Sequence, residues 1–118
     1  MGIPTIEIGL GEVAIRAFLD TGAPISYLNR QYLEWLNPID HKEDFYPNFG
    51  RFKTPIYELP IDFASKKIDF TFGVLPNRIE TALLKGDTLA IIGNDIFRHF
   101  TIFFDYANRK IYLRQEEN

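Results

Sequence analysis

The 118-residue sequence contains no cysteine, so it can form neither disulfide bonds nor thiolate metal sites. It also has no apolar run of the length that crosses a membrane. The first residues lack the charged and apolar regions of a secretory signal peptide. From these three absences we predict a cytoplasmic protein that has no membrane partner.

Charge of one sign is not concentrated anywhere in the sequence. Thirteen Lys and Arg residues and sixteen Asp and Glu residues are interspersed, which gives a formal net charge of −3. Because nucleic-acid-binding domains normally show a basic patch, we expect no nucleic-acid partner. The two histidines, His41 and His99, are too far apart in the sequence to have the spacing of metal ligands. We therefore expect neither a metal ion nor another cofactor.

Aromatic residues, in contrast, are abundant: the chain has eleven Phe, six Tyr and one Trp. Phe and Tyr favour β-strands, and several segments alternate between apolar and polar residues as half-buried strands do. The segments that we predict as strands are residues 5–8, 12–19, 25–28, 56–63, 68–75, 79–84, 90–92, 101–106 and 110–113. Many short strands separated by turn residues indicate an all-β barrel or sandwich, in one domain that spans residues 1–118.

Two short helices complete the predicted architecture. Asn29 is a good helix cap in front of residues 30–36, and Asn94 is a candidate cap for a second helix over residues 94–100. Asp95 stands in the first turn of that second helix, where an acidic side chain is favourable. Residues 39–44 are polar and are predicted as a surface connection.

Residues 18–23, Phe-Leu-Asp-Thr-Gly-Ala, place an ionisable group in an unusual position. Asp20 follows a predicted apolar strand, and a carboxylate that is half buried there needs a hydrogen-bond partner. Gly22 allows the backbone to turn sharply and to present an amide to that carboxylate. The tripeptide is also good turn chemistry, so these residues alone leave a purely structural turn as the alternative.

A second motif, Ala-Ile-Ile-Gly at residues 90–93, makes the purely structural turn a poor explanation. In this order, the two motifs resemble those of the aspartic proteases. The chain length and the single Asp-Thr-Gly are similar to the retroviral type, whereas residues 91–111 look like the end of a pepsin lobe. The resemblance extends from about Thr5 to Leu113. It implies a single-lobe, retropepsin-like acid-protease barrel with one or two short helices.

The resemblance also implies an aspartic endopeptidase that hydrolyses a peptide or protein substrate as a homodimer. Two aspartates held close together share one proton, so that one activates a water and the other donates a proton to the scissile carbonyl. Because the sequence has one such motif, the second catalytic Asp20 would come from another copy of the chain. We expect an acidic to near-neutral pH optimum.

Supporting roles follow from the same resemblance. In this family Thr21 would brace the facing loop, Gly22 would donate its amide to the carboxylates, and Ala23 would line the substrate groove. Three further residues would pack behind the Asp20 loop, namely Ile91, Ile92 and Gly93.

Residues 45–52 contain four aromatic side chains among turn-forming residues. Considered by themselves, they indicate a hairpin with aromatic cross-strand pairs. The resemblance adds a function, because aspartic proteases carry a flap here, a hairpin that closes over the bound peptide. The expected substrate contacts in this flap are Tyr46, Phe49 and Gly50.

Two positions depart from the retroviral pattern, in which an acid after the Asp-Thr-Gly-Ala motif pairs with an arginine after the later glycine. Pro24 and Asn94 stand at these positions. Absence of this ion pair favours the alternative function, a catalytically inactive protease-like module that binds peptides or mediates self-association. A third interpretation is a β-barrel adaptor whose resemblance is only structural. Ser26 has no evident histidine partner, which argues against a serine hydrolase.

Overall fold

The computed structural model describes residues 3–115, which form nine strands, one α-helix and two 3₁₀-helices. The strands are β1 (Thr5–Leu10), β2 (Val13–Leu19), β3 (Tyr27–Leu28), β4 (Asp40–Tyr46), β5 (Gly50–Phe63), β6 (Lys66–Phe72), β7 (Thr88–Ile92), β8 (Phe100–Asp105) and β9 (Lys110–Gln115). The helices are η1 (Arg30–Tyr32), α1 (Asn77–Leu83) and η2 (Asn94–Arg98). Within this part of the chain, every helix is too short and too polar to span a membrane.

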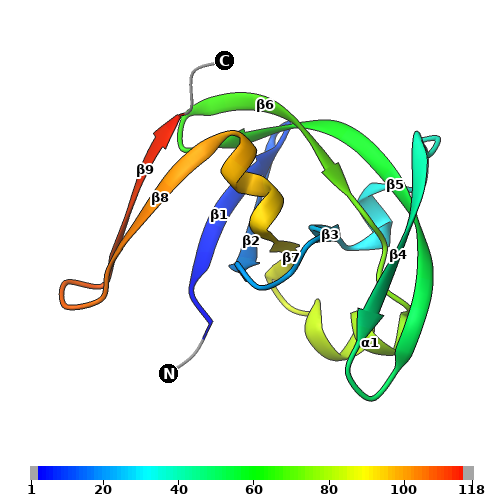
Figure 1. Ribbon diagram of the computed structural model, residues 1–118. Coiled ribbons are helices and arrows are strands. Elements are labelled where there is room, and N and C mark those ends of the chain that lie inside the picture. The colour runs from blue at the N-terminus through cyan, green and yellow to red at the C-terminus, as the bar shows by residue number, and fades with distance from the viewer. Residues whose placement is uncertain (1–2, 116–118) are drawn as a thin grey trace.

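Seven strands form one sheet in the order β3-β7-β2-β1-β5-β4, and β6 pairs with β5 outside this path. β1 and β2 form the antiparallel hairpin that the alternating residues predict, with Leu10 opposite Val13. The long strand β5 pairs with β4 through its first half and with β6 through its second. In Figure 1, β5 and β6 arch over one end of β1 and β2, so the sheet curls around its own interior. The prediction of an all-β barrel is confirmed.

Aliphatic and phenylalanine side chains fill the interior of the curled sheet. Along β2 the residues alternate between exposed and buried, which places Ile15, Ala17 and Leu19 in the core. In the same core, the rings of Phe63 and Phe100 pack with their centroids 4.8 Å apart. The end of β2 is therefore held by buried contacts immediately before Asp20.

The prediction of a surface connection at residues 39–44 is wrong, because residues 40–44 belong to the edge strand β4. β4 pairs with β5 along its whole length, from Asp40 opposite Ile56 to Tyr46 opposite Gly50. Backbone pairing does not require apolar side chains, and charged residues are typical of exposed edge strands. The hairpin predicted at residues 45–52 is therefore only the tip of a much longer one, which reaches down one side of the barrel (Figure 1).

The strand predicted at residues 79–84 is also wrong, since α1 occupies this segment. A helix lets Ile79 and Leu83 point to one side, and it buries Glu80 against η1. Glu80 accepts hydrogen bonds from the backbone N–H of Arg30 at 2.8 Å and from its Nε at 2.7 Å. The Glu80 carboxylate is thus buried because it pairs with Arg30, and the local alternation of apolar and polar residues does not reveal this distant partner.

Both predicted short helices exist, but as 3₁₀-helices that are shorter than expected. Asn29 caps η1 through its side chain, which accepts a hydrogen bond from the amide of Gln31 at 3.1 Å. The predicted cap of the second helix is wrong: Gly93 holds the cap position of η2 and Asn94 is its first residue. η2 buries Ile96 in the core. Segments this short cannot repeat the backbone hydrogen bonds that sustain an α-helix.

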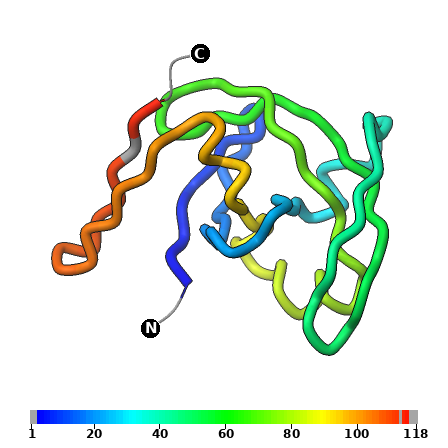
Figure 2. The backbone as a smooth tube through the Cα atoms, viewed as in Figure 1, coloured from blue at the N-terminus to red at the C-terminus, as the bar shows by residue number. Residues whose placement is uncertain are grey.

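The last two strands form a separate hairpin, as the sequence predicts, with Phe100 opposite Gln115. It projects from the barrel on the side opposite to the β4–β5 hairpin (Figure 2). The hairpin carries three exposed aromatic residues, Phe103, Tyr106 and Tyr112. The barrel therefore lies between two projecting hairpins, and only one of them approaches Asp20, as described next.

Candidate functional site

Asp20 stands at the point where the parallel strands β2 and β7 end together. Leu19 pairs with Ile92, and the Asp20 amide donates a hydrogen bond to the Ile92 carbonyl at 2.8 Å. The chain then turns, because the Ala23 amide donates to the Asp20 carbonyl at 3.0 Å. The Gly22 amide donates to the Asp20 carboxylate at 3.1 Å. Asp20 is half-buried in this turn.

The two aliphatics and the glycine of the second motif lie directly behind this turn. Ile91 and Ile92 are buried at the end of β7. At Gly93 the backbone approaches the turn so closely that an added Cβ would lie 2.5 Å from the Ala23 carbonyl oxygen. The next amide, of Asn94, donates to the same oxygen at 2.8 Å. Only glycine fits at this contact, which ties the two motifs into one unit.

Beneath the turn, a hydrogen-bonded group joins the two motifs a second time; we call Ser26, Gly93 and Asp95 the support layer. The Ser26 hydroxyl is completely buried, accepts the Gly93 amide at 2.8 Å and donates to the Asp95 carboxylate at 2.6 Å. Burial raises the pKa of Asp95, and the hydrogen bond from Ser26 opposes that rise. Asp95 thus accepts the hydrogen bond of the buried Ser26 hydroxyl, and it also stands in the first turn of η2.

Sequence reasoning missed the support layer, although one signal pointed to it. Ser26 lies among Ile25, Tyr27 and Leu28, all of which are buried. A hydroxyl in such an apolar run needs a partner from elsewhere in the chain, because an unpaired buried hydroxyl costs free energy. The partner was not predictable from spacing, since residues 26 and 95 are distant in the sequence.

Asp20 lies in the floor of a cavity of about 330 Å³ beneath the tip of the β4–β5 hairpin. Gly22 and Ala23 line this cavity beside Asp20, whereas Thr21 is exposed and does not. The full lining comprises Asp20, Gly22, Ala23, Pro24, Tyr27, Asp44, Phe45, Tyr46, Pro47, Leu75 and Ile91. The cavity therefore combines a carboxylate floor, apolar walls and a roof from the hairpin.

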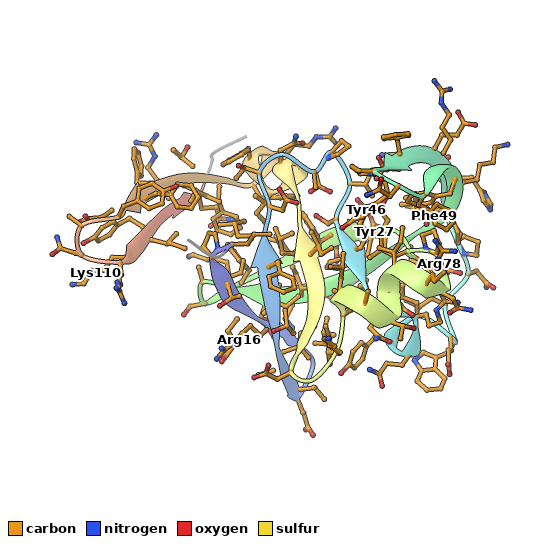
Figure 3. The ribbon with its side chains drawn as sticks, turned by 90° about the horizontal axis from the view of Figure 1, so that it is seen from below. Arg16, Tyr27, Tyr46, Phe49, Arg78 and Lys110 are labelled. Carbon is orange, nitrogen blue, oxygen red and sulfur yellow. The ribbon has the colours of Figure 1, made fainter. Side chains whose placement is uncertain are left out.

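The three residues predicted as flap contacts separate in the structure. Tyr46 lines the cavity with Asp20, but Phe49 does not. The Phe49 ring packs edge-on against Phe52, 5.9 Å away, and the Arg78 guanidinium of α1 lies 6.0 Å from its centre (Figure 3). Gly50 has φ of +105°, a conformation that favours glycine, and closes the turn at the tip. Phe49 and Gly50 thus shape the tip of the hairpin but do not line the Asp20 cavity.

A side-chain hydrogen bond fastens the hairpin to the barrel at the edge of the cavity. The buried Tyr27 hydroxyl of β3 donates to the Asp44 carboxylate of β4. Burial raises the pKa of Tyr27 far above its usual value, and the hydrogen bond and negative charge of Asp44 add to the rise. The Tyr27 ring also packs against Phe52, with centroids 6.3 Å apart. The hairpin is thereby held over the cavity rather than away from it.

Other candidate positions gain no chemical role. In residues 3–115, no three or more His, Asp or Glu side chains gather in a way that would hold a metal ion. His41 is exposed on β4, and His99 packs against the Phe70 ring with centroids 5.7 Å apart. A larger hollow of about 600 Å³ lies between η1, β5 and the start of α1, and Asp20 is not part of it. The cavity that contains Asp20 is thus the candidate functional site.

No protein-family model matches this sequence, and no curated protein sequence is similar to it. Solved structures, however, share its backbone arrangement. The solution structure of the simian foamy virus (mac) protease has a TM-score of 0.57 at 16% identity, over 78% of this chain and 89% of that one. The retroviral protease-like domain of Ddi1 from Leishmania major has a TM-score of 0.60 at 17% identity, over 96% and 88%. This chain has the fold of a retropepsin-like aspartic protease.

The EIAV protease in complex with the inhibitor HBY-793 shares the retropepsin-like fold as well, with a TM-score of 0.55 at 20% identity. The match covers 82% of this chain and 86% of that protease. Identities in this range establish the fold, while the activity of the chain has to be argued from its own site. Three features of that site bear on activity: the position of Asp20, the cavity above it and the hairpin that covers it.

Proposed function

We propose that this chain is one protomer of a homodimeric aspartic endopeptidase, in which Asp20 of each copy supplies half of the catalytic pair. The observation that carries the proposal is the placement of Asp20 in the floor of a hairpin-covered cavity, in a retropepsin-like fold. The whole chain would act as a single domain with a peptide or protein as its substrate.

The proposed mechanism needs two aspartates at one site. When two carboxylates lie close together they share a proton, so that one accepts a proton from a water and the other donates to the scissile carbonyl. The water then attacks the peptide carbon directly, and no covalent intermediate forms. Asp20 is the only aspartate of this loop, and Asp44, the other carboxylate of the cavity, is engaged by Tyr27. A second Asp20 across a two-fold axis is the arrangement that completes the pair.

The other residues of the site would act on Asp20 or on the substrate. The Gly22 amide would hold the carboxylate in position, as its 3.1 Å hydrogen bond suggests. Ala23 would line the substrate groove, and the exposed Thr21 is free to contact the corresponding loop of the second copy. Tyr46 would cover the bound peptide from the hairpin. The support layer would keep the turn rigid while substrate binds.

Mixing experiments with the Asp20→Asn variant test this proposal directly. Purified Asp20→Asn protein should hydrolyse no peptide that the wild type cleaves, with a loss of about 10³-fold or more. When equal amounts of variant and wild type are mixed and allowed to exchange protomers, about a quarter of the dimers carry two intact Asp20 residues. Activity per wild-type chain should therefore fall by about half, whereas independent monomers would show no such loss.

A module that binds peptides without cleaving them is the second candidate function. In place of the ion pair that retroviral enzymes form next to this loop, Pro24 is exposed and Asn94 bonds to Ala23 only through its backbone amide. This difference removes a contact that helps organise the dimer in that family. Sedimentation at micromolar concentration distinguishes the candidates: a strict monomer has one carboxylate per site and cannot perform the shared-proton chemistry.

A further inference from the structure

The cavity above Asp20 contains a second carboxylate that the proposed reaction does not use. Asp44 enters the cavity from β4, on the hairpin side, while Asp20 lies in the floor. The lining includes no Lys, Arg or His, so two carboxyl groups face a space that has no positively charged side chain of its own. The neighbouring walls are apolar and include Leu75 and Ile91. A space of this kind attracts a cation that also has apolar surface.

The Asp44 carboxylate is held in a fixed orientation and keeps hydrogen-bonding capacity. One oxygen accepts the Tyr27 hydroxyl, and the other accepts the amide of Phe45 at 2.8 Å. A carboxylate offers about four acceptor positions, so these two bonds leave room for donors of a ligand. Tyr27 itself is buried, and Figure 3 shows it near Tyr46 at the hairpin. The charge is therefore positioned in advance, which lowers the cost of binding.

No cation of the described residues neutralises Asp44. The ion pairs within 4.0 Å in that part of the chain are Arg30 with Glu80 and Lys67 with Asp62. Arg51 lines a hollow together with Asp44 and Glu43, but it forms no ion pair within 4.0 Å with the Asp44 carboxylate. The inner side of the carboxylate is thus available to a ligand.

We propose that Asp44 is a specificity determinant, and that the cavity receives a lysine or arginine side chain of a peptide close to the scissile bond. The aliphatic stem of such a side chain would pack on the apolar walls, and its charged end would reach Asp44. This inference rests on the proposed function for the location of the scissile bond. In a two-fold symmetric dimer each protomer supplies one such cavity, so the preference holds on both sides of that bond.

The test compares uncleavable peptides that differ in one charge. Each carries a hydroxyethylene group in place of the scissile amide, with either lysine or norleucine at successive positions on both sides. Norleucine has the stem of lysine without its amine. Fluorescence anisotropy should give about tenfold tighter binding for lysine at a position next to the scissile group. The Asp44→Asn variant, which keeps an acceptor for Tyr27, should bind both peptides equally.

Two controls separate this effect from general electrostatics and from misfolding. Glu43→Gln removes a neighbouring carboxylate that lies outside the cavity, and should keep the preference for lysine. In the wild type alone, added salt should weaken binding of the lysine peptide more than that of the norleucine peptide. This second measurement does not depend on the folding of any variant.

Equal binding of the two peptides at every position, including no binding of either, overturns the inference, as does a lysine preference that persists in Asp44→Asn. The outcome is independent of catalysis. If lysine is preferred but the wild type hydrolyses no peptide, the inference stands and the proposed reaction fails. If Asp20-dependent hydrolysis occurs without a preference for basic residues, the reaction stands and the role of Asp44 fails.

Discussion

The turn that carries Asp20 and the support layer beneath it differ in exposure and in bonding. Thr21 and Gly22 are exposed, and the Asp20 carboxylate has one hydrogen bond, from the Gly22 amide. Ser26 and Gly93, in contrast, are buried and bonded to each other. The accessible groups are those that the proposed reaction would use, while the buried groups hold the turn in its position. Substitutions in the two regions should therefore affect different properties.

The largest loss of stability is expected from Gly93→Ala. Its new methyl group would lie 2.5 Å from the Ala23 carbonyl oxygen, a backbone atom that cannot move without displacing the Asp20 turn. Such overpacking should lower the free energy of unfolding by about 3 kcal/mol, measured by urea denaturation. Gly22→Ala is the matched control from the exposed turn, because its new methyl group meets its nearest neighbour, the Asp20 carboxylate, at 3.4 Å. Equal losses in the two variants would contradict the comparison.

Ser26→Ala should have the next largest effect. It removes the acceptor of the buried Gly93 amide and the donor to Asp95 at once. An unsatisfied buried donor and a half-buried carboxylate without its partner should together cost about 2 kcal/mol in the same measurement. Thr21→Val removes a hydroxyl from the exposed turn instead, and in protein dilute enough to be monomeric it should change stability by less than about 0.5 kcal/mol. A Ser26→Ala protein as stable as Thr21→Val would show that the support layer contributes nothing.

The barrel and the Asp20 loop were predictable from the sequence because both depend on local patterns. Alternation along residues 12–19 defines a strand, and an aspartate followed by Gly22 defines a turn at its end. Long-range pairs have no such pattern. The strand predicted at residues 79–84 is wrong because the local sequence does not show that Glu80 is buried through its pairing with Arg30. Likewise, the hydrogen bond from Ser26 to Asp95 joins two segments that are distant in the sequence and meet only in the fold.

The same limit applies to the β4–β5 hairpin. Its aromatic tip was visible in the sequence, but the charged strand β4 reads as a surface connection until its pairing with β5 is known. Tyr46 lines both the Asp20 cavity and a hollow beside Arg78, whereas Phe49 lines that hollow but not the Asp20 cavity, and this difference depends on the turn geometry at the tip. Turn geometry of this kind is set by a few backbone angles, such as φ of +67° at Asn48, which composition does not specify.

A smaller effect, visible only as a pH dependence, is expected from Asp95. Burial raises its pKa in the folded state, so the folded protein binds more protons than the unfolded one between the ordinary pKa of 3.8 and the raised value. The contribution of Asp95 to stability is therefore full below pH 3.8 and is lost as the pH rises through the folded pKa. Asp95→Asn should gain stability relative to the wild type on going from pH 3 to pH 7, as measured by urea denaturation at both values.

Asp105 supplies a control of opposite sign for this measurement. Hydrogen bonds from Asn108 lower the pKa of this exposed carboxylate, so its contribution to stability is present above pH 3.8 and is lost as the pH falls. Asp105→Asn should therefore lose stability relative to the wild type between pH 3 and pH 7. If both variants changed in the same direction, the pH dependence would reflect overall charge and not the surroundings of each carboxylate.

The smallest change in stability is expected from Asp20→Asn, the substitution that should abolish hydrolysis. An asparagine side-chain oxygen can still accept the Gly22 amide, and the Asp20 backbone keeps its bonds to Ile92 and Ala23. We therefore expect the free energy of unfolding to stay within about 0.5 kcal/mol of the wild type, measured by urea denaturation with both proteins at the same concentration. A loss as large as that of Ser26→Ala would mean that Asp20 itself holds the turn together. In that case inactivity of the variant would no longer identify a catalytic carboxylate, because a displaced turn would explain it equally well.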